Sequence, residues 1–383
     1  MEETSLKKPL VAKKVALVHD FLVSYGGAER VFEAMCELYP EAPIYTLLYD
    51  RERMGEHFRG RDIRVSWLKK LPRFIQNRYR FLLPFFPVAV ESIDLREFDV
   101  VISSSGAWSK GIITRLNTTH IAYLHSPMRY AWDYHEQYLG EIGARGKVRI
   151  FSRMLLSYLR IWDRQAALRP DILLANSRYT AARIKKYYRC EAPVIYPGAL
   201  SLFEKVGNVS GAPENKREYF LVVSRLTLSK KVDTVVEAFN KLGLPLLVVG
   251  EGRERVRLEK LAKSNIRFAG FVPEEELAAL YRGARALIFP AEEDFGMVAV
   301  EALSFGTPVI AFEYGGIREI IQEGVTGEWY HAQAAEIVAE GVRRFLAKEG
   351  TYEETVMKQS VACFTKSHFQ DEMRAVVEHA ING

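Results

Sequence analysis

The chain is poor in cysteine, and its cysteines form no recognisable motif. Only Cys36, Cys190 and Cys363 occur in 383 residues, far apart and odd in number, with no CxxC pair or Cys/His cluster. This arrangement supports neither a disulfide framework nor a zinc site. We therefore expect a reducing compartment, and a cytoplasmic protein fits best.

Long hydrophobic runs are also missing. No apolar run reaches the length of a membrane span, and the most hydrophobic stretch, residues 81–90, is broken by two prolines. The apolar residues 15–18 follow two lysines but stop at His19 and Asp20. This pattern predicts a first strand and not a signal peptide.

A large excess of one charge sign is missing as well. The formal net charge is only +5, from 53 basic and 48 acidic residues, and no aromatic-interleaved recognition module is present. Nucleic acid is therefore not an expected partner. The length and the hydrophobic content of 48% are enough for two domains with cores.

Short apolar runs alternate with amphipathic helical patterns, which is typical of doubly wound parallel α/β sheets. The polar stretch 207–217 predicts an interdomain linker. We expect a first domain over residues 1–205 and a second over 206–365. The predicted strands cover residues 15–18, 100–102, 120–123, 172–175, 220–223, 246–249, 266–268, 286–289 and 308–311. The predicted helices cover residues 29–38, 233–242, 253–264, 274–282, 297–305 and about 369–379.

Two glutamates eight positions apart flank a predicted helix start. Glu293 lies on an acidic loop after a strand, and Glu301 lies in the first turns of the next helix. The N–H groups of Gly296, Met297 and Val298 form an anion site at that helix start. Carboxylates bind hydroxyls and amides bind phosphate, so this chemistry suits a sugar nucleotide. The alternative is an acidic helix N-terminus stabilised by its dipole.

Two cations follow the first strand of the second domain. Arg225 and Lys230 lie five residues apart between that strand and a helix. Such cations can neutralise a diphosphate leaving group. The alternative is an exposed, solvated basic loop, as most lysines and arginines are. No DxD-like acidic pair stands beside a histidine, so no metal or other cofactor is expected.

Further polar positions follow strands of the first domain. Gly26 and Gly27 open a helix after the first strand, which suits close approach of a phosphate but also any tight turn. His125 follows the strand at 120–123, and a histidine there is often structural. Arg129 and Asp133 can shape an acceptor site or form a structural salt bridge.

The segment Gly250-Glu251-Gly252 imitates a dinucleotide fingerprint, because it follows a strand and precedes a helix. The third glycine is missing, and no acidic residue ends the next strand at Phe268. A dehydrogenase is therefore excluded.

Several of these segments resemble the family-4 class of GT-B glycosyltransferases. The E-x7-E pattern formed by Glu293 and Glu301 carries the resemblance, together with residues 25–30, 125–133, 222–233, 302–311 and 314–319. The resemblance implies two Rossmann-like domains facing a central cleft, with a last helix at 366–383 that crosses back to the first domain. It also implies retention of anomeric configuration and a metal-independent transfer.

The resemblance assigns roles to individual residues. Glu293 would hold donor-sugar hydroxyls, Glu301 the ribose, and Arg225 and Lys230 the diphosphate. The remaining positions would lie around the donor and acceptor: His125 beside the reacting sugar, Gly27 at the diphosphate, Gly26, Arg129 and Asp133 near the acceptor, and Gly250, Phe271 and Val272 near the base.

The run from His125 to Asp133 is similar to the branch with bacterial O-antigen mannosyltransferases. GDP-mannose is therefore the expected donor, with a UDP-sugar as the alternative, and the acceptor is expected to be lipid-linked or an oligosaccharide. Three other hypotheses are a sugar-nucleotide 2-epimerase, a glycoside hydrolase using paired carboxylates, and a non-catalytic binding subunit. The hydrolase leaves Arg225 and Lys230 unexplained.

Two basic, aromatic stretches remain. Residues 64–80 contain six basic and no acidic residues, with Trp67, Phe74 and Tyr79 interleaved, and residues 145–169 repeat the bias. One interpretation is docking of a peripheral protein on an anionic membrane at the inner face. The other is a solvated helix face above an ordinary core stripe.

Overall fold

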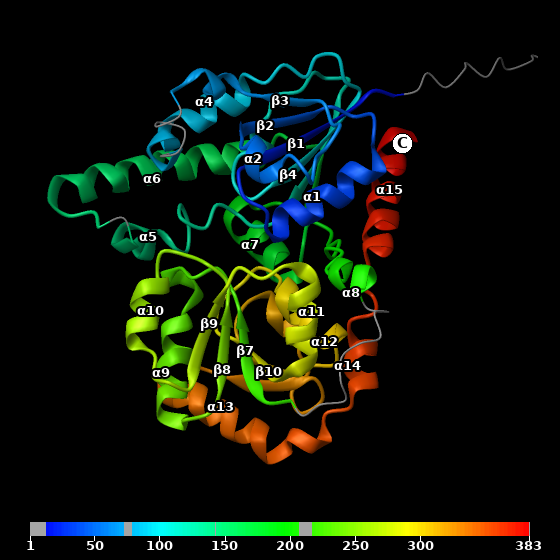
Figure 1. Ribbon diagram of the computed structural model, residues 1–383. Helices are drawn as coiled ribbons and strands as arrows, with labels where there is room; N and C mark the ends of the chain where they lie inside the picture. Colours follow the sequence, from blue (N-terminus) through cyan, green and yellow to red (C-terminus); the bar gives the residue numbers. More distant parts are fainter. Residues whose placement is uncertain (1–12, 73–78, 142, 207–216, 383) are drawn as a thin grey trace, which may run out of the picture. The chain divides into compact units, whose positions relative to one another are not determined.

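The computed structural model describes residues 13–72, 79–141, 143–206 and 217–382. The chain divides into two compact units (Figure 1). Unit 1 comprises Met1–Asp133, Ile150–Leu174 and Ala375–Gly383, and unit 2 comprises Tyr134–Arg149 and Ala175–Arg374.

Unit 1 is built on a six-stranded sheet in the order β3-β2-β1-β4-β5-β6. β1 pairs in parallel with β2 and β4, and β4 pairs in parallel with β5. The chain thus starts at the centre and winds outward in both directions, which is the doubly wound order. The strands are β1 (Val15–Leu22), β2 (Ile44–Tyr49), β3 (Ile63–Val65), β4 (Val100–Ser105), β5 (Thr119–Leu124) and β6 (Ile172–Ala175).

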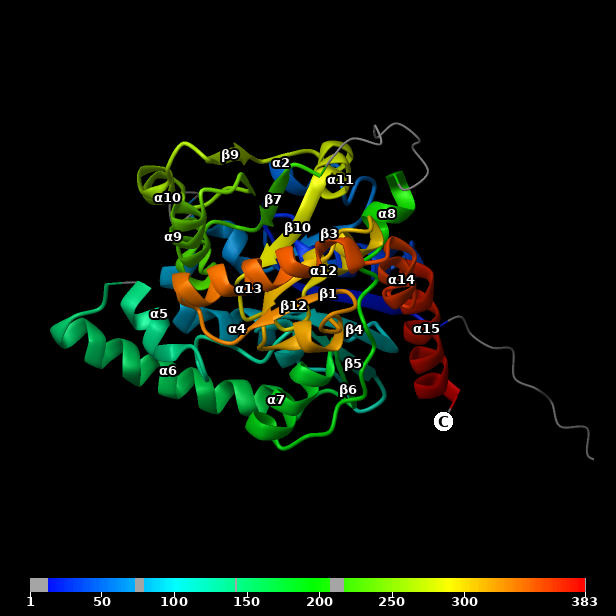
Figure 2. The same ribbon diagram turned by 90° about the horizontal axis from the view of Figure 1, so that it is seen from below.

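Helices pack on this sheet through one apolar side each. In α1 (Gly27–Leu38) the buried side chains Val31, Phe32 and Met35 recur at helical spacing. Figure 2 shows α4 (Phe86–Glu91) beside the long helix α6 (Gly146–Ala166), and the Trp162 indole N–H donates to Glu91 at 2.8 Å. The shorter helices before β6 are α2 (Arg51–Met54), η1 (Trp67–Lys70), η2 (Tyr79–Phe85), η3 (Ser109–Gly111) and α5 (His135–Glu141), of which α5 belongs to unit 2.

Unit 2 repeats the plan with the strand order β12-β11-β10-β7-β8-β9. One face of the sheet packs Leu221 and Leu287, and the other face packs Phe220 and Ile288. Both faces are therefore covered by helices, as parallel sheets require. The strands are β7 (Tyr219–Val223), β8 (Leu246–Val249), β9 (Ile266–Gly270), β10 (Ala284–Phe289), β11 (Val309–Phe312) and β12 (Gly327–Tyr330).

The helices of unit 2 include two from the segment between β6 and β7. They are α7 (Arg178–Tyr188), α8 (Ser201–Val206), η4 (Leu228–Lys230), α9 (Val232–Leu242), α10 (Arg255–Leu261), α11 (Glu274–Gly283), α12 (Met297–Ser304), η5 (Gly316–Glu319), α13 (Ala335–Lys348), η6 (Glu349–Thr351) and α14 (Glu354–Ser360). The last helix, α15 (Lys366–Asn382), begins in unit 2 and ends in unit 1, where the Lys13 ammonium donates to the Ile381 carbonyl at 2.9 Å.

The predicted fold class is confirmed, because both sheets are parallel and doubly wound. β1 extends beyond the predicted strand and includes His19 and Asp20, which find buried partners on neighbouring strands and loops. Residues 175–205 pack with unit 2, not with the predicted first domain. Most of the predicted linker, residues 207–216, lies outside the described residues. Within the described ranges, no helix is both long and apolar enough to cross a membrane.

A buried ion pair fixes α6 to unit 1. The Lys110 ammonium of η3 lies 2.6 Å from the Asp163 carboxylate of α6, and both side chains are almost completely buried. The Trp132 indole N–H also donates to Asp163, at 2.7 Å. A buried ion pair holds its place only when such additional hydrogen bonds satisfy the charges.

A buried histidine makes the stability of unit 1 depend on pH. The His120 ring lies 2.8 Å from the Ser103 hydroxyl in the core. Burial, together with the charge of Arg169, lowers the pKa of His120 from 6.5 to about 3. The folded chain therefore excludes a proton that the unfolded chain binds below about pH 6.5.

We predict that the free energy of unfolding falls as the pH drops from 6.5 to 5, by up to about 1.4 kcal/mol per pH unit from His120 alone. Urea unfolding of wild type and of His120→Gln at several pH values measures this contribution. The glutamine cannot titrate, so its stability curve should be flatter over this interval. Parallel curves would contradict the assignment.

Candidate active site

Two loops of unit 2 place a cation against a carboxylate. Lys230 ends η4, after β7, and Glu293 lies on the acidic loop after β10. The Lys230 ammonium donates directly to the Glu293 carboxylate, and both side chains are only partly buried. Because β7 and β10 are neighbours in a parallel sheet, their carboxyl ends meet at one edge, where such sheets bind ligands. Arg225, on the same loop as Lys230, is exposed.

The start of α12 adjoins this pair. Gly296 is the N-cap residue with φ 113°, and the helix begins at Met297. Helix geometry leaves the first N–H groups without an intrahelical acceptor. The half-buried Met297 and Val298 therefore present backbone donors close to Glu293 in the sequence. This arrangement provides amides for phosphate beside a carboxylate for hydroxyls.

Glu301 lies one turn further along α12 and is nearly inaccessible. Only 2% of the residue is exposed, and its carboxylate accepts a hydrogen bond of 2.8 Å from the Tyr281 hydroxyl of α11. The structure thus places Glu301 between two helices, whereas Glu293 faces Lys230. The predicted contact of Glu301 with a ribose stays a prediction.

The residues on either side of Glu293 are held by α7. The Arg183 guanidinium forms a largely buried ion pair with Asp294, and the Ser177 hydroxyl donates to the Asp294 carbonyl at 2.5 Å. The Tyr179 hydroxyl donates to Glu292 at 2.7 Å. Burial and the adjacent Glu292 carboxylate raise the pKa of Tyr179, so the phenol stays a donor. These contacts make α7 a clamp on the acidic loop, which the sequence did not indicate.

A glycine pair supports the loop from the other side. The Gly316 N–H donates to the Glu293 carbonyl at 2.9 Å, and Gly315 has φ 97°. A Cβ on Gly315 would lie 2.4 Å from the Glu293 carbonyl oxygen. No larger residue fits there without moving the loop, which explains the need for glycine in the motif at 314–319.

The same segment is tied to α7 through Glu319. Its carboxylate accepts hydrogen bonds from the backbone N–H groups of Arg178 and Tyr179, both at 2.9 Å. The Tyr196 hydroxyl adds a third bond of 2.9 Å. A carboxylate at the first N–H groups of a helix is favourable because it satisfies donors that lack intrahelical acceptors. The acidic loop therefore lies between two segments that are bonded to each other.

The Gly250 segment packs against the Lys230 loop. A Cβ on Gly250 would lie 1.9 Å from the Ser224 carbonyl oxygen, and the Leu226 N–H donates to the Glu251 carbonyl at 2.8 Å. Glycine is needed here for close contact between two loops, which agrees with rejecting a dinucleotide site. Just beyond β9, Phe271 is 81% exposed and Val272 half-buried. An aromatic ring so exposed is available to stack on a nucleotide base.

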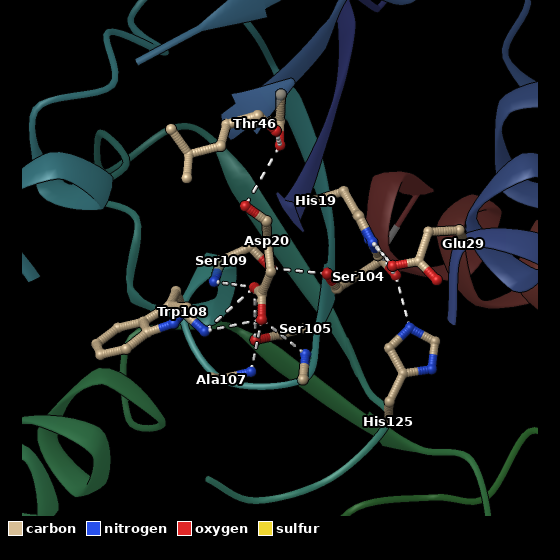
Figure 3. Close-up of polar contacts among 12 residues, drawn as sticks. His19, Asp20, Glu29, Thr46, Ser104, Ser105, Ala107, Trp108, Ser109 and His125 are labelled. Atoms are coloured by element: carbon tan, nitrogen blue, oxygen red, sulfur yellow. Dashed lines mark hydrogen bonds and ion pairs between the residues drawn. The ribbon is translucent and has the colours of Figure 1, made fainter. Parts of the chain in front are cut away.

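Unit 1 contains a chain of polar side chains that ends at His125. The His125 ring lies 2.7 Å from the Ser104 hydroxyl, which lies 3.0 Å from the His19 ring (Figure 3). His19 in turn faces Glu29 of α1 at 3.6 Å. Burial raises the pKa of Glu29, but the hydrogen bond and charge of His19 and the charge of His125 outweigh it, so the pKa is lowered overall. The chain fixes the His125 ring at the carboxyl end of β5.

Asp20 organises the loop after β4. Its buried carboxylate accepts hydrogen bonds from the N–H groups of Gly106, Ala107, Trp108 and Ser109, the shortest at 2.6 Å (Figure 3). The Ser109 hydroxyl closes the loop with a bond of 2.8 Å to the Ser104 carbonyl. Asp20 thus indirectly positions the strand end that carries Ser104.

The remaining predicted positions of unit 1 are accessible. Gly26 is the N-cap of α1, Gly27 and Asp133 are exposed, and Arg129 is half-buried. The predicted residues therefore form two groups, one in each unit. That the two groups share one cleft stays a prediction.

A cavity of about 890 Å³ in unit 1 is lined by Tyr45, Arg64, Trp67, Glu97 and Arg115, among others. Its lining includes residues that precede β4 and β5 in the chain, so it lies at the amino ends of those strands and apart from the predicted sites. In the part of the chain that the structure describes, no group of three or more His, Cys, Asp or Glu side chains could hold a metal ion.

Comparisons with known proteins indicate the class of protein. Residues 25–199 match the family described as Glycosyltransferase Family 4, and residues 208–359 match Glycosyl transferases group 1. An uncharacterized glycosyltransferase of Methanocaldococcus jannaschii is 32% identical over 179 residues, which are 44% of this chain and 46% of that protein. The chain thus aligns with about half the length of the first curated relatives it matches.

Solved structures share the whole fold. A sucrose-phosphate synthase from Thermosynechococcus elongatus has a TM-score of 0.71 and 20% identity, with 96% of this chain and 99% of that chain covered. The Anabaena protein HepE in complex with UDP-glucose has a TM-score of 0.65 and 16% identity, with 96% and 100% covered. Two doubly wound units of this kind are the GT-B fold. The two matched models together cover most of the chain, which is thus similar to family-4 glycosyltransferases, as its sequence predicts.

The α7 clamp leads to a prediction about stability. Arg183→Met leaves the buried Asp294 carboxylate without its cation, which should cost about 3 kcal/mol of unfolding free energy or more. The Arg183→Met/Asp294→Asn double variant should lose less than the sum of the single losses. Urea unfolding measures all three variants.

The matched control is Arg178→Met, on the same helix but exposed. It should change the unfolding free energy by no more than about 0.5 kcal/mol. Equal effects of the Arg178 and Arg183 variants would contradict the clamp.

Proposed function

We propose that this chain transfers a hexose from a nucleotide-diphosphate sugar to an acceptor, without a metal ion and with retention of anomeric configuration. The observation that carries the proposal is the Lys230–Glu293 pair beside the N-terminus of α12. The likeness in fold to HepE, solved with UDP-glucose, supports a donor of this class.

The pair gives a mechanism for donor binding. Phosphate oxygens that approach Lys230 compete with the Glu293 carboxylate for the ammonium. The exchange frees Glu293 to bind hydroxyls of the donor sugar while Lys230 and Arg225 neutralise the diphosphate. As the glycosidic bond breaks, the growing charge on the leaving diphosphate meets cations that are already in place. Such preorganised stabilisation is worth about 3–4 kcal/mol per donor group.

We propose that His125, at the end of the polar chain in unit 1, acts by contact and not as a general base. Ser104 lies at one ring nitrogen and so orients the ring, and His125 is only half-buried. We assign His125 to contact with the sugar and with the transition state. Gly26 and Gly27 face the diphosphate and the acceptor, and Arg129 and Asp133 shape the acceptor site.

The nucleoside part of the donor is assigned to the edge of unit 2 near β8 and β9. In this proposal Phe271 and Val272 lie near the base together with the Gly250 loop, and the Phe271 ring, which is 81% exposed, stacks on the base. Glu301 binds the ribose in this proposal. Because Glu301 is buried beside Tyr281, ribose binding requires a local shift of its side chain.

The donor we propose is GDP-mannose, on the resemblance of the run from His125 to Asp133 to mannosyltransferases. A UDP-sugar is the alternative, and the HepE complex favours it. The acceptor is proposed to be lipid-linked or an oligosaccharide in cell-surface polysaccharide synthesis. The enzyme would then act in the cytoplasm at the inner face of an anionic membrane.

A panel of GDP, UDP, ADP and their sugars, in the presence of excess EDTA, tests the donor. A nucleotide at a hundred times its dissociation constant should stabilise the protein by about 2.7 kcal/mol in thermal unfolding. We expect GDP and GDP-mannose to give this shift. A shift with UDP compounds alone would reassign the base, and dependence on Mg²⁺ would contradict the metal-free mechanism. Sugar release from a glycoside without nucleotide would indicate a hydrolase instead.

Lys230 and its neighbour Lys231 provide a matched pair for the mechanism. Lys230→Gln should lower kcat about 10²- to 10³-fold, because one preorganised donor to the leaving group is lost. Lys231→Gln removes the same charge. Because Lys231 lies in the αL turn into α9 and the contact with Glu293 is made by Lys230, the kcat of Lys231→Gln should stay near that of wild type. Steady-state kinetics with the donor found above decides between them. Equal losses would reduce the pair to a general charge effect.

A further inference from the structure

Helix α6 presents apolar side chains on two different faces. Its inner face is buried in unit 1 through Leu156, Leu159, Trp162 and Ala166. A second group, which we call the exposed stripe, consists of Ile150, Phe151, Met154, Tyr158 and Ile161, with exposures between 50% and 67%. The spacings of four, four and three residues from Ile150 through Met154 and Tyr158 to Ile161 place the stripe along one side of the helix.

Isolated apolar residues on a surface are ordinary, but a continuous row of five on one helix is not. The core does not need them, because the inner face already fills its place on unit 1. The neighbouring helix α4 adds Val88, which is 58% exposed, and Phe85 just before it is 51% exposed. The fold of unit 1 therefore leaves the apolar side chains of the stripe exposed.

The charges on α6 indicate which kind of partner covers the stripe. The helix carries five basic residues, and its one acidic residue, Asp163, is buried against Lys110. Arg153 and Arg164, both exposed, form a basic row next to the stripe, since eleven residues are about three helical turns. Arg160 lies between them but donates to the Ala131 carbonyl at 2.9 Å and lies over the Trp132 ring. A second copy of α6 would bring the same charges together. Anionic lipid instead accepts the stripe among its acyl chains and the basic row among its headgroups.

We propose that the exposed stripe of α6 docks unit 1 on an anionic membrane surface. At about 1.5 Å per residue, the 21 residues of α6 give a helix roughly 31 Å long that can lie in the interface. The proposal depends on the glycosyltransferase function only for the identity of a lipid-linked acceptor. The docking itself is a property of unit 1.

This location differs from the other basic stretch in the sequence. Arg64 is bonded to Glu97 at 3.0 Å, to Asp62 at 2.9 Å and to the Tyr45 hydroxyl at 2.6 Å, and Trp67 is partly buried. Arg73, Phe74 and Arg78 lie outside the described residues. In the described part of that stretch Arg64, Lys69 and Lys70 are exposed, and Arg64 is already paired with two carboxylates.

Co-sedimentation of the full chain with vesicles tests the proposal, using equal parts phosphatidylglycerol and phosphatidylcholine, or phosphatidylcholine alone. Wild type should sediment with the anionic vesicles, and raised salt should release part of it. Replacing Phe151, Met154 and Ile161 by Ser should weaken binding at least tenfold. Arg153→Gln/Arg164→Gln should remove the preference for anionic vesicles.

Two controls separate the stripe from other effects. Val256→Ser, at a position on α10 that is 63% exposed, removes one exposed apolar side chain in unit 2 and should bind vesicles like wild type. Lys69→Gln/Lys70→Gln should also bind like wild type. The stripe variant should keep wild-type stabilisation by nucleotide, so failure of docking and failure of donor binding are distinguishable.

Three outcomes would overturn the proposal. In the first, wild type stays in the supernatant with anionic vesicles. In the second, the stripe variant sediments like wild type. In the third, sedimentation equilibrium shows a wild-type dimer that the stripe variant loses, which makes a second copy the occupant of the stripe.

Discussion

Three consecutive acidic side chains after β10 each depend on a separate partner. Glu292 is bonded to Tyr179, Glu293 to Lys230, and Asp294 to Arg183. Adjacent carboxylates repel one another, and each needs its own compensation when partly buried. Because α7 and the Lys230 loop supply these partners from two separate segments of unit 2, the acidic loop is held on two sides. Glu293 is the member of the three whose partner is a candidate ligand of phosphate.

Unit 1 also compensates buried polar side chains, here within its central strand. β1 runs through His19 and Asp20, two polar residues that would be costly to bury without partners. The Ser104 hydroxyl on β4 is hydrogen-bonded to the His19 ring, and backbone N–H groups of the loop after β4 donate to the Asp20 carboxylate. The strand thus continues to Leu22, and its polar end fixes the position of the loop and of His125. In both units, polar groups at strand ends hold the adjoining loops in place.

The parts of the fold that the sequence predicts are those with local signals. β8 has the predicted bounds, and α9 and α12 differ from prediction by one residue, because apolar runs and helical spacing depend on neighbouring residues. The strand β12 lacks such a signal because it contains Glu328, a buried carboxylate. Glu328 is tolerated in a strand since Lys348 and Tyr352 bond to it at 2.9 and 2.7 Å. Those partners lie 20 and 24 residues away along the chain, so no local sequence pattern indicates them.

The same distinction explains which features of the site could be found from the sequence. Motif spacing favours Lys230 over Lys231, and the backbone gives the reason. Lys231 has φ 53°, and its carbonyl accepts the Thr234 hydroxyl at 2.8 Å, so it forms the turn into α9. That turn leaves Lys230 at the end of η4, where its ammonium reaches Glu293. The clamp by Arg183 has no comparable motif, since its partner is 111 residues away and only the folded unit brings the two together.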